Sequence, residues 1–398
     1  MEVPAGPAVV DRPELRRHPA LHSGVARERL RGQIEDGKPV LRLDRGPTGE
    51  RFVTYVDAYG DFRRVDWLDP SSGDTAVWDV LLHLFRDEGV DPKLAVLFTT
   101  FELPSGIYYL PLANDVSGIG EPLYDRTKNR LLDGYVFMND VPYWVGTPER
   151  VDEAATLFNQ EVGHRFGVFV ETDLGKGPSS ELLGRDQQHW SYFVHTGASP
   201  MEGNAWIDNG DGTFTTDTPP NNLFYHPLDL YLMGLVPADD VEGTFVIRNP
   251  GGGGLDCFGF PLGPGSVPQF CEPQKTVMGE RHDFGVADIV AVEGPREPAW
   301  PDAPDRFEIA FVLLALPGDE RSADLLFAFD DLVGRLVDGF HAGTGGRAEL
   351  VLVTGQKGGL DDLGETEGCG CRLASPPPGG AFGVLMALLL AGYRRRRR

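Results

Sequence analysis

The residues in this chain best suited to chemistry by type and spacing are Gln160, Glu161 and His164, in the run Gln-Glu-Val-Gly-His. Positions i and i+4 of an α-helix lie on the same face, so two metal-binding side chains with that spacing can hold one ion. A Glu next to the first of them lies beside the ion and can polarise water. The full arrangement is H-E-x-x-H, and Gln160 stands at its first position. The pattern therefore predicts a site with Glu161 as the catalytic residue and His164 as a metal ligand.

These residues must be carried by a helix, and the surrounding sequence predicts one over 147–169. Thr147 followed by Pro148 is a typical helix start, because a Thr side chain caps the first free N–H groups and Pro fits the first helical position. Ala, Leu, Phe and Val then recur at helical spacing. We expect a helix at 76–87 and strands at 93–103, 107–112 and 134–139 to precede it.

In this setting the run resembles the motif of the zincin metallopeptidases, and the resemblance covers residues 40–245. It implies an α+β fold, with a mixed sheet, an active-site helix and a loop-rich C-terminal part. It also implies zinc as the cofactor and a peptide or protein as the substrate, hydrolysed by metal-activated water. By this resemblance His164 binds zinc, while Glu161 activates water and then protonates the leaving amine.

A third ligand must come from farther along the chain. One zincin branch has the extended pattern H-x-x-G-x-x-H, but Val170 occupies the third position here, which excludes that branch. The best candidate is His189. It lies in a segment, 182–204, that resembles the downstream block of a group of bacterial secreted zincin-like proteins, as does the segment 228–241.

The same segment offers other candidates. Met201 is a candidate for a floor beneath the metal, and Glu202 and Asp186 are alternative carboxylate ligands. His195 and His226 are weaker candidates.

Gln160 limits what such a site can do. Its amide oxygen is a poor zinc ligand beside neutral imidazole, because zinc prefers nitrogen and sulfur donors. The expected site is impaired unless a carboxylate takes the place of the first ligand. Two functions stay open at this point: a zinc-dependent peptidase, and an inactive binding or structural module that keeps the zincin fold.

The charge of the chain argues against a nucleic-acid partner. The 398 residues carry 60 acidic and 36 basic side chains, for a net charge of −24. The last thirty residues contain six Arg and no acid, so residues 1–368 carry −30. An acidic body without a basic patch repels a phosphate backbone.

We expect four parts along the chain. Residues 1–38 form a poorly ordered leader, 39–355 the zincin-like domain with a C-terminal subdomain from about 245, 356–378 a polar and Pro-rich linker, and 379–398 an apolar tail ending in an Arg cluster. Further expected elements are strands at 40–44, 306–316 and 348–354, hairpins over 51–67 and around 208–212, and helices at 228–235 and 323–342.

Cysteines and the C-terminus point to export. Cys257 and Cys271 lie in a Gly/Pro-rich loop that a disulfide would stabilise by about 3 kcal/mol, although two free thiols are the alternative. No secretory signal is readable at the N-terminus. We expect either that the true start lies upstream, the preferred alternative, or that the protein is not exported by the usual route. The order Cys369-Gly-Cys371, spacer, short apolar stretch and five Arg resembles the myxobacterial C-terminal sorting tail. It implies recognition of a Cys by a membrane protease and retention at the cell surface, with a simple tail anchor as the alternative.

Overall fold

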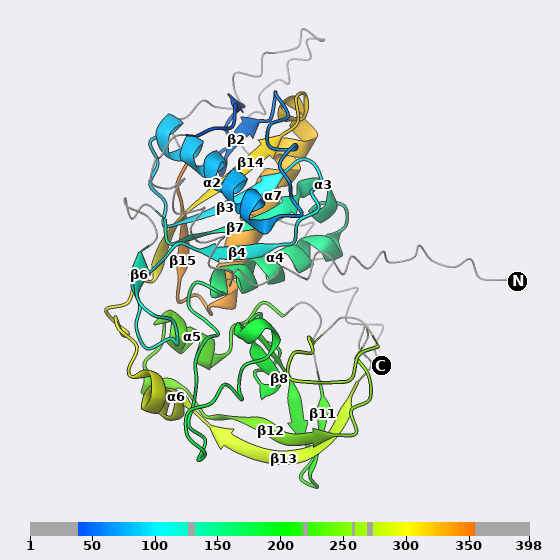
Figure 1. Cartoon of the computed structure of the whole chain (residues 1–398), viewed down its shortest axis with the longest axis vertical. Coiled ribbons are helices and arrows are strands. Elements are labelled where there is room, and N and C mark those ends of the chain that lie inside the picture. The colour runs from blue at the N-terminus through cyan, green and yellow to red at the C-terminus, as the bar shows by residue number, and fades with distance from the viewer. Residues whose placement is uncertain (1–38, 126–131, 218–221, 257–258, 269–273, 355–398) are drawn as a thin grey trace, which may run out of the picture. The chain divides into compact units, whose positions relative to one another are not determined.

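The structure is a computed structural model, and it describes residues 39–125, 132–217, 222–256, 259–268 and 274–354 (Figure 1). These residues contain two mixed β-sheets, a two-stranded ribbon and six α-helices. The expected α+β class agrees with this mixture of strands and helices.

The first sheet is built mainly from parallel strands. Its order is β1-β2-β14-β3-β7-β4, with β15 paired to β14. Strands β2, β14, β3 and β7 run parallel, whereas β1 and β4 pair antiparallel at the edges. The bounds are β1 Asp44–Arg45, β2 Phe52–Val56, β3 Leu94–Thr99, β4 Tyr108–Pro111, β7 Gly134–Asp140, β14 Arg306–Ala315 and β15 Glu349–Leu352.

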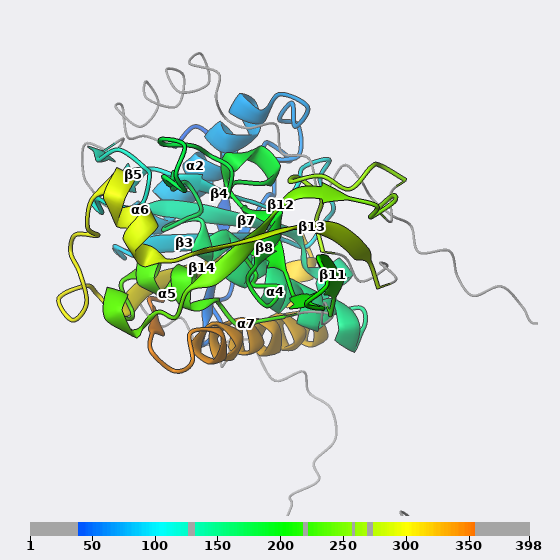
Figure 2. The same cartoon turned by 90° about the horizontal axis from the view of Figure 1, so that it is seen from below.

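Helices cover both faces of this sheet, because its strands alternate buried side chains between two cores. Ala95, Leu97 and their neighbours pack against α2 (Pro70–Asp87). Val96 and Phe98 pack instead into the core that contains α4 (Pro148–Gly163) and α7 (Ala323–Gly343). Figure 2 shows α4 and α7 side by side, and these two helices contact each other. The short helix α3 (Val141–Trp144) precedes α4.

The second sheet follows α4 in the chain. Its order is β10-β11-β13-β12-β8-β9, antiparallel except for the β8–β9 pair. The bounds are β8 Trp190–His195, β9 Glu202–Asn204, β10 Trp206–Asp208, β11 Thr213–Thr216, β12 Thr244–Gly251 and β13 Thr276–Phe284. Around it lie α5 Pro227–Met233, α6 Val286–Glu293, the ribbon of β5 Ala113–Asn114 and β6 Tyr124–Asp125, and the 3-10 turns η2 Arg185–Gln187, η3 Ala238–Asp240 and η4 Asp319–Arg321.

Most expected elements are confirmed, and the differences have physical causes. The predicted hairpin over 51–67 is wrong: β2 ends at Val56, and the chain then turns around the buried carboxylate of Asp57. The helix expected to reach residue 169 ends at Gly163, since the next residues form tight turns that reverse the chain. The hairpin around 208–212 is present as β10 and β11.

The segment after residue 245 contributes to both sheets. It supplies β12 and β13 to the second sheet and the central strand β14 to the first. The division of the chain into four parts stays a prediction. The leader, Cys257, Cys271 and the C-terminal tail with Cys369 and Cys371 lie outside the described residues. Within the described ranges, no helix has both the length and the apolar character needed to cross a membrane.

Candidate active site

The C-terminal turn of α4 carries the three residues that the sequence singled out. Thr147 caps the start of the helix by accepting a hydrogen bond from the Arg150 N–H. At the other end, Gln160, Glu161 and His164 are all at most 8% exposed. The helix therefore presents its polar residues to the protein interior, which is costly unless they find partners there.

His164 meets His189, the residue expected to be the third ligand. Their Nε2 atoms lie 3.2 Å apart, and the rings are perpendicular. Each Nδ1 lies within hydrogen-bond distance of a backbone carbonyl: His164 to Gly167 at 3.1 Å and His189 to Arg185 at 2.9 Å. A carbonyl can only accept, so these bonds place the ring protons on Nδ1 and leave both Nε2 atoms unprotonated.

Both imidazoles are held in the neutral state. Burial lowers the pKa of His164 well below its usual value, and the neighbouring His189 lowers it further. Burial also lowers the pKa of His189, with the positive charge of Arg185 acting in the same direction. Neutral imidazole with an unprotonated Nε2 is the form that binds a metal.

Glu202 brings a carboxylate to the same place. It begins β9, and its Oε1 accepts hydrogen bonds from Gln160 Nε2 at 3.1 Å and from Arg185 Nη2 at 2.6 Å. This oxygen lies 4.0 Å from His189 Nε2. The other oxygen, Oε2, is buried and has no hydrogen-bond partner among the described residues. A buried, unsatisfied carboxylate oxygen has free capacity for a proton or a cation.

Arg185 was not predicted from the sequence, yet it bonds to two members of the site. Its Nη2 donates to Glu202 and lies 2.8 Å from His189 Nε2, which must accept because a guanidinium has only donors. Its side chain is 28% exposed, against 5% and 8% for those two partners. Arg185 thus covers the cluster from the solvent side, and no spacing rule in the sequence distinguishes it from other Arg residues.

The surroundings of Glu161 bring the pKa of its carboxyl group close to neutrality. Burial raises its pKa to about 7, and the nearby Glu202 raises it too, while Arg185 and the Tyr109 N–H act in the opposite direction. A carboxyl group with a pKa near neutrality can both accept and return a proton.

Met201 lies against the helix, close to where the sequence placed a floor. A Cβ built on Gly163 would come within 2.2 Å of the Met201 sulfur, so only Gly allows this approach. The segment is fixed by Asp229 of α5, which accepts hydrogen bonds from Trp190 Nε1 at 2.7 Å and Ser199 Oγ at 2.6 Å. Asp229 therefore positions Trp190, next to His189, and Ser199, three residues before Glu202.

The remaining candidates have other surroundings. Asp186 has a 45% exposed side chain and pairs with Arg185 Nη1 at 3.6 Å. His195 accepts from the Trp206 N–H and stacks on Phe245, and His226 caps α5. The structure thus brings Gln160, Glu161, His164, His189 and Glu202 together. His195 and His226 have separate partners, whereas Asp186 shares Arg185 with the cluster.

The geometry of the two imidazoles can be compared with that of a zinc site. Two nitrogens bound to one tetrahedral zinc at about 2.0–2.1 Å are separated by about 3.3 Å. The observed Nε2 separation of 3.2 Å matches this value. As they stand, however, no three His, Cys, Asp or Glu side chains in the described part of the chain converge as a complete metal site. Glu202 is directed to Gln160 and Arg185 instead.

Comparisons with known proteins leave the family of this chain open. No family model, no curated protein and no solved structure matches it.

Proposed function

We propose that this protein is a zinc-dependent peptide hydrolase on a zincin-like fold, with His164, His189 and Glu202 as the ligands and Glu161 as the catalytic residue. The observation that carries the proposal is the pair of imidazoles anchored through Nδ1, with their Nε2 atoms 3.2 Å apart. Two unprotonated Nε2 atoms at this distance repel each other unless a cation or a donor lies close to them. In the structure the Arg185 guanidinium donates to His189 Nε2, and zinc would take that role for both rings. Two His and one Glu are also an established ligand set of catalytic zinc.

The order of elements supports the same proposal. Helix α2, strands β3, β4 and β7, and then the motif helix α4 follow one another as the resemblance implies. In this arrangement Glu202 takes the place that Gln160 leaves empty, and Gln160 acts through its hydrogen bond to the Glu202 carboxylate.

Each residue of the proposed site would have a distinct role in hydrolysis. When bound, zinc supplies Lewis acidity toward a peptide carbonyl and toward water. Glu161 takes a proton from the attacking water and returns it to the leaving nitrogen, which its pKa of about 7 permits in both directions. His164 and His189 keep their ring protons on Nδ1 through the carbonyls of Gly167 and Arg185. Arg185 must move, because it covers the site and holds Glu202.

The decisive experiment is zinc analysis of the purified chain after incubation with zinc and removal of the excess. We expect one zinc per chain, lost in His164→Ala and in Glu202→Gln. His341→Ala is the matched control, because His341 lies on α7 and bonds to the Ala348 carbonyl. Wild-type protein without zinc would contradict the proposal, and so would equal zinc in all three variants.

A second function is favoured by Arg185: an inactive binding module in which the guanidinium serves as the resident cation. Its Nη2 already bonds to His189 and Glu202, so the site is partly neutralised without metal. The variant Arg185→Gln separates the two functions. If zinc binds, removing the positive charge should raise zinc affinity about tenfold or more; if Arg185 is the permanent partner, the variant should lose stability and gain no zinc.

The cellular location belongs to the same proposal. We place the protein at the cell surface, exported and retained through its C-terminal tail after processing at Cys369 or Cys371, with the membrane and a sorting protease as partners. Deleting residues 381–398 should release the protein from the cell envelope. A truncated protein that stays with the membrane fraction would contradict this assignment.

A further inference from the structure

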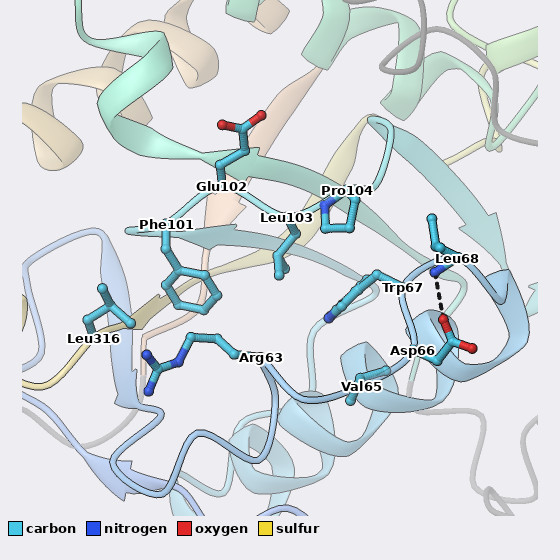
Figure 3. A pocket seen from close by; sticks show the side chains of 10 residues that line it. All are labelled: Arg63, Val65, Asp66, Trp67, Leu68, Phe101, Glu102, Leu103, Pro104 and Leu316. Atoms are coloured by element: carbon cyan, nitrogen blue, oxygen red, sulfur yellow. Dashed lines mark hydrogen bonds between the residues drawn. The ribbon is translucent and has the colours of Figure 1, made fainter.

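A surface pocket of about 560 Å³ lies apart from the residues discussed so far (Figure 3). Three loops form it, and each loop follows a parallel strand of the first sheet. They contribute Arg63 and residues 65–68 after β2, residues 101–104 after β3, and Leu316 after β14. The pocket thus lies at the carboxyl ends of three neighbouring strands.

The topology makes this edge a natural place for a ligand. The chain leaves β2 toward α2 on one face of the sheet, and it leaves the adjacent strand β14 toward α7 on the other face. Connections that diverge to opposite faces open a crevice at the carboxyl ends of the strands, where open α/β sheets bind ligands. The volume is in the usual range for a small-molecule site.

The apolar walls of the pocket are held in place from behind. Trp67 stacks on Phe137 and donates its indole N–H to the Phe62 carbonyl. Asn139 fixes the opposite wall, because its side chain bonds to both the N–H and the carbonyl of Leu103. The pocket is therefore preformed, which lowers the entropic cost of binding.

Arg63 is the charged side chain that turns toward the apolar lining. Figure 3 shows its guanidinium beneath Phe101 and beside Leu316, while Glu102 and Asp66 point away from the lining. The buried carboxylate of Asp57 accepts from Arg63 Nε at 3.0 Å and fixes one edge of the guanidinium. Nη2 donates to the backbone carbonyl of Asp57 at 3.3 Å, and among the described residues Nη1 has no hydrogen-bond partner, so Nη1 is available to a ligand.

We propose that this pocket binds a small apolar carboxylate, with its carboxylate on Arg63 and its apolar body between Phe101, Trp67 and Leu68. A guanidinium has only donors, which excludes an amine as the group that meets Arg63. Charge-assisted hydrogen bonds are about twice as strong as neutral ones, which favours a carboxylate over an amide. The exposed side chain of Leu68, 83% accessible, becomes covered when the ligand is bound.

The test uses calorimetric titration of the full chain with three isosteric probes: 3-phenylpropionate, 3-phenylpropanamide and 3-phenylpropylamine. We expect the carboxylate to bind about tenfold or more tightly than the amide, and the amine not to bind. Equal affinity of all three probes, tighter binding of the amine, or no binding by the carboxylate would overturn the proposal.

Variants at the rim of the pocket test ligand binding without changing the folding of the protein. Arg63→Gln removes the charge but leaves Asp57 buried without its ion pair, so the variant risks unfolding. Leu68→Asp leaves the core intact and should weaken binding of 3-phenylpropionate about tenfold, whereas Leu123→Asp, at a side chain 63% exposed outside the pocket, should not. Equal effects of the two Leu variants would overturn the placement of the ligand.

The same carboxylate chemistry can come from a free acid or from the C-terminus of a peptide. A tripeptide that ends in Phe, used with a free and with an amidated terminus, separates the two sources. Tighter binding of the free-terminus peptide than of 3-phenylpropionate identifies a peptide end, and weaker binding identifies a small acid.

Discussion

The His164–Glu202 cluster and the Arg63 pocket contrast in access and in polarity. The cluster gathers two imidazoles and two carboxylates from α4, the loop before β8 and β9, all nearly excluded from solvent and covered by Arg185. The pocket gathers apolar side chains and one guanidinium at the surface. The cluster has groups that can carry a proton or bind a cation, but it is nearly closed to solvent. The pocket has room for a ligand but lacks an arrangement of groups that could transform it.

The largest expected effect tests whether the cluster is catalytic. Glu161→Gln keeps the shape of the side chain but removes its ability to carry a proton, so kcat for peptide hydrolysis should fall about 10²- to 10⁴-fold. Zinc content should stay unchanged, because Glu161 is not one of the proposed ligands. Steady-state kinetics with a quenched fluorescent peptide measures the change.

Glu149→Gln is the matched control, since Glu149 lies exposed in the first turn of the same helix. Its kinetics should equal those of the wild type. Full activity of Glu161→Gln would assign hydrolysis to another residue and remove the main chemical difference between the two regions.

The next effect concerns the pH dependence of stability. Burial raises the pKa of Asp229 in the folded state to about 6, whereas an unfolded Asp titrates near 3.8. The folded protein therefore binds this proton more tightly. The corresponding stability is fully present below pH 4 and is lost as the pH rises through 6, by about 3 kcal/mol.

Chemical denaturation of wild type and Asp229→Asn across pH 4 to 7 measures this contribution. The free energy of unfolding of the wild type should fall relative to that of the variant as the pH increases. Parallel curves for the two proteins would show that Asp229 is not the titrating group.

A smaller effect tests the fit between Met201 and α4. Gly163→Ala places a methyl group 2.2 Å from the Met201 sulfur, so the free energy of unfolding should fall by about 1–3 kcal/mol. Gly334→Ala in α7 is the matched control, because the nearest atoms to its new Cβ lie at 3.8 Å. That variant should gain about 0.5–1 kcal/mol from better helix propensity. Thermal or urea unfolding compares the two variants with the wild type. Equal stability of Gly163→Ala and the wild type would mean that the Met201 side chain moves aside without a loss of stability.

The smallest effect tests whether the two regions are independent. Leu68→Asp at the rim of the pocket should change the free energy of unfolding by at most about 0.5 kcal/mol, as is usual for exposed positions. Zinc content and peptide hydrolysis should match the wild type. A change in either property would indicate that the pocket and the cluster are coupled.

The same two regions show what the sequence can and cannot predict. The helix that carries Glu161 and His164 was predictable, since its cap and its residue spacing are local features. His189 and Glu202 were identified as candidates from the segment that contains them. Arg185 was not, because its role depends on how the turn at 185–187 folds over the cluster, and no local pattern records that.

The pocket could not be predicted from local features of the sequence. Its three loops become neighbours only because β14 inserts between β2 and β3, a long-range pairing without a spacing signature. The predicted hairpin over 51–67 failed for a related reason. The alternation of apolar and polar residues in that segment continues past Asp57. The strand nevertheless ends there, because the Asp57 carboxylate accepts hydrogen bonds from the N–H groups of Phe62 and Arg63 and turns the chain.

The central place of β14 also has a consequence for how the chain is made. Strand β14 pairs with both β2 and β3, and Arg51 forms an ion pair with Asp330, 279 positions later in the chain. The first sheet cannot close until nearly all of the folded region has left the ribosome, because its middle strand is synthesised after the whole second sheet. Contacts of such long sequence separation slow folding and leave strand edges open to aggregation in the meantime.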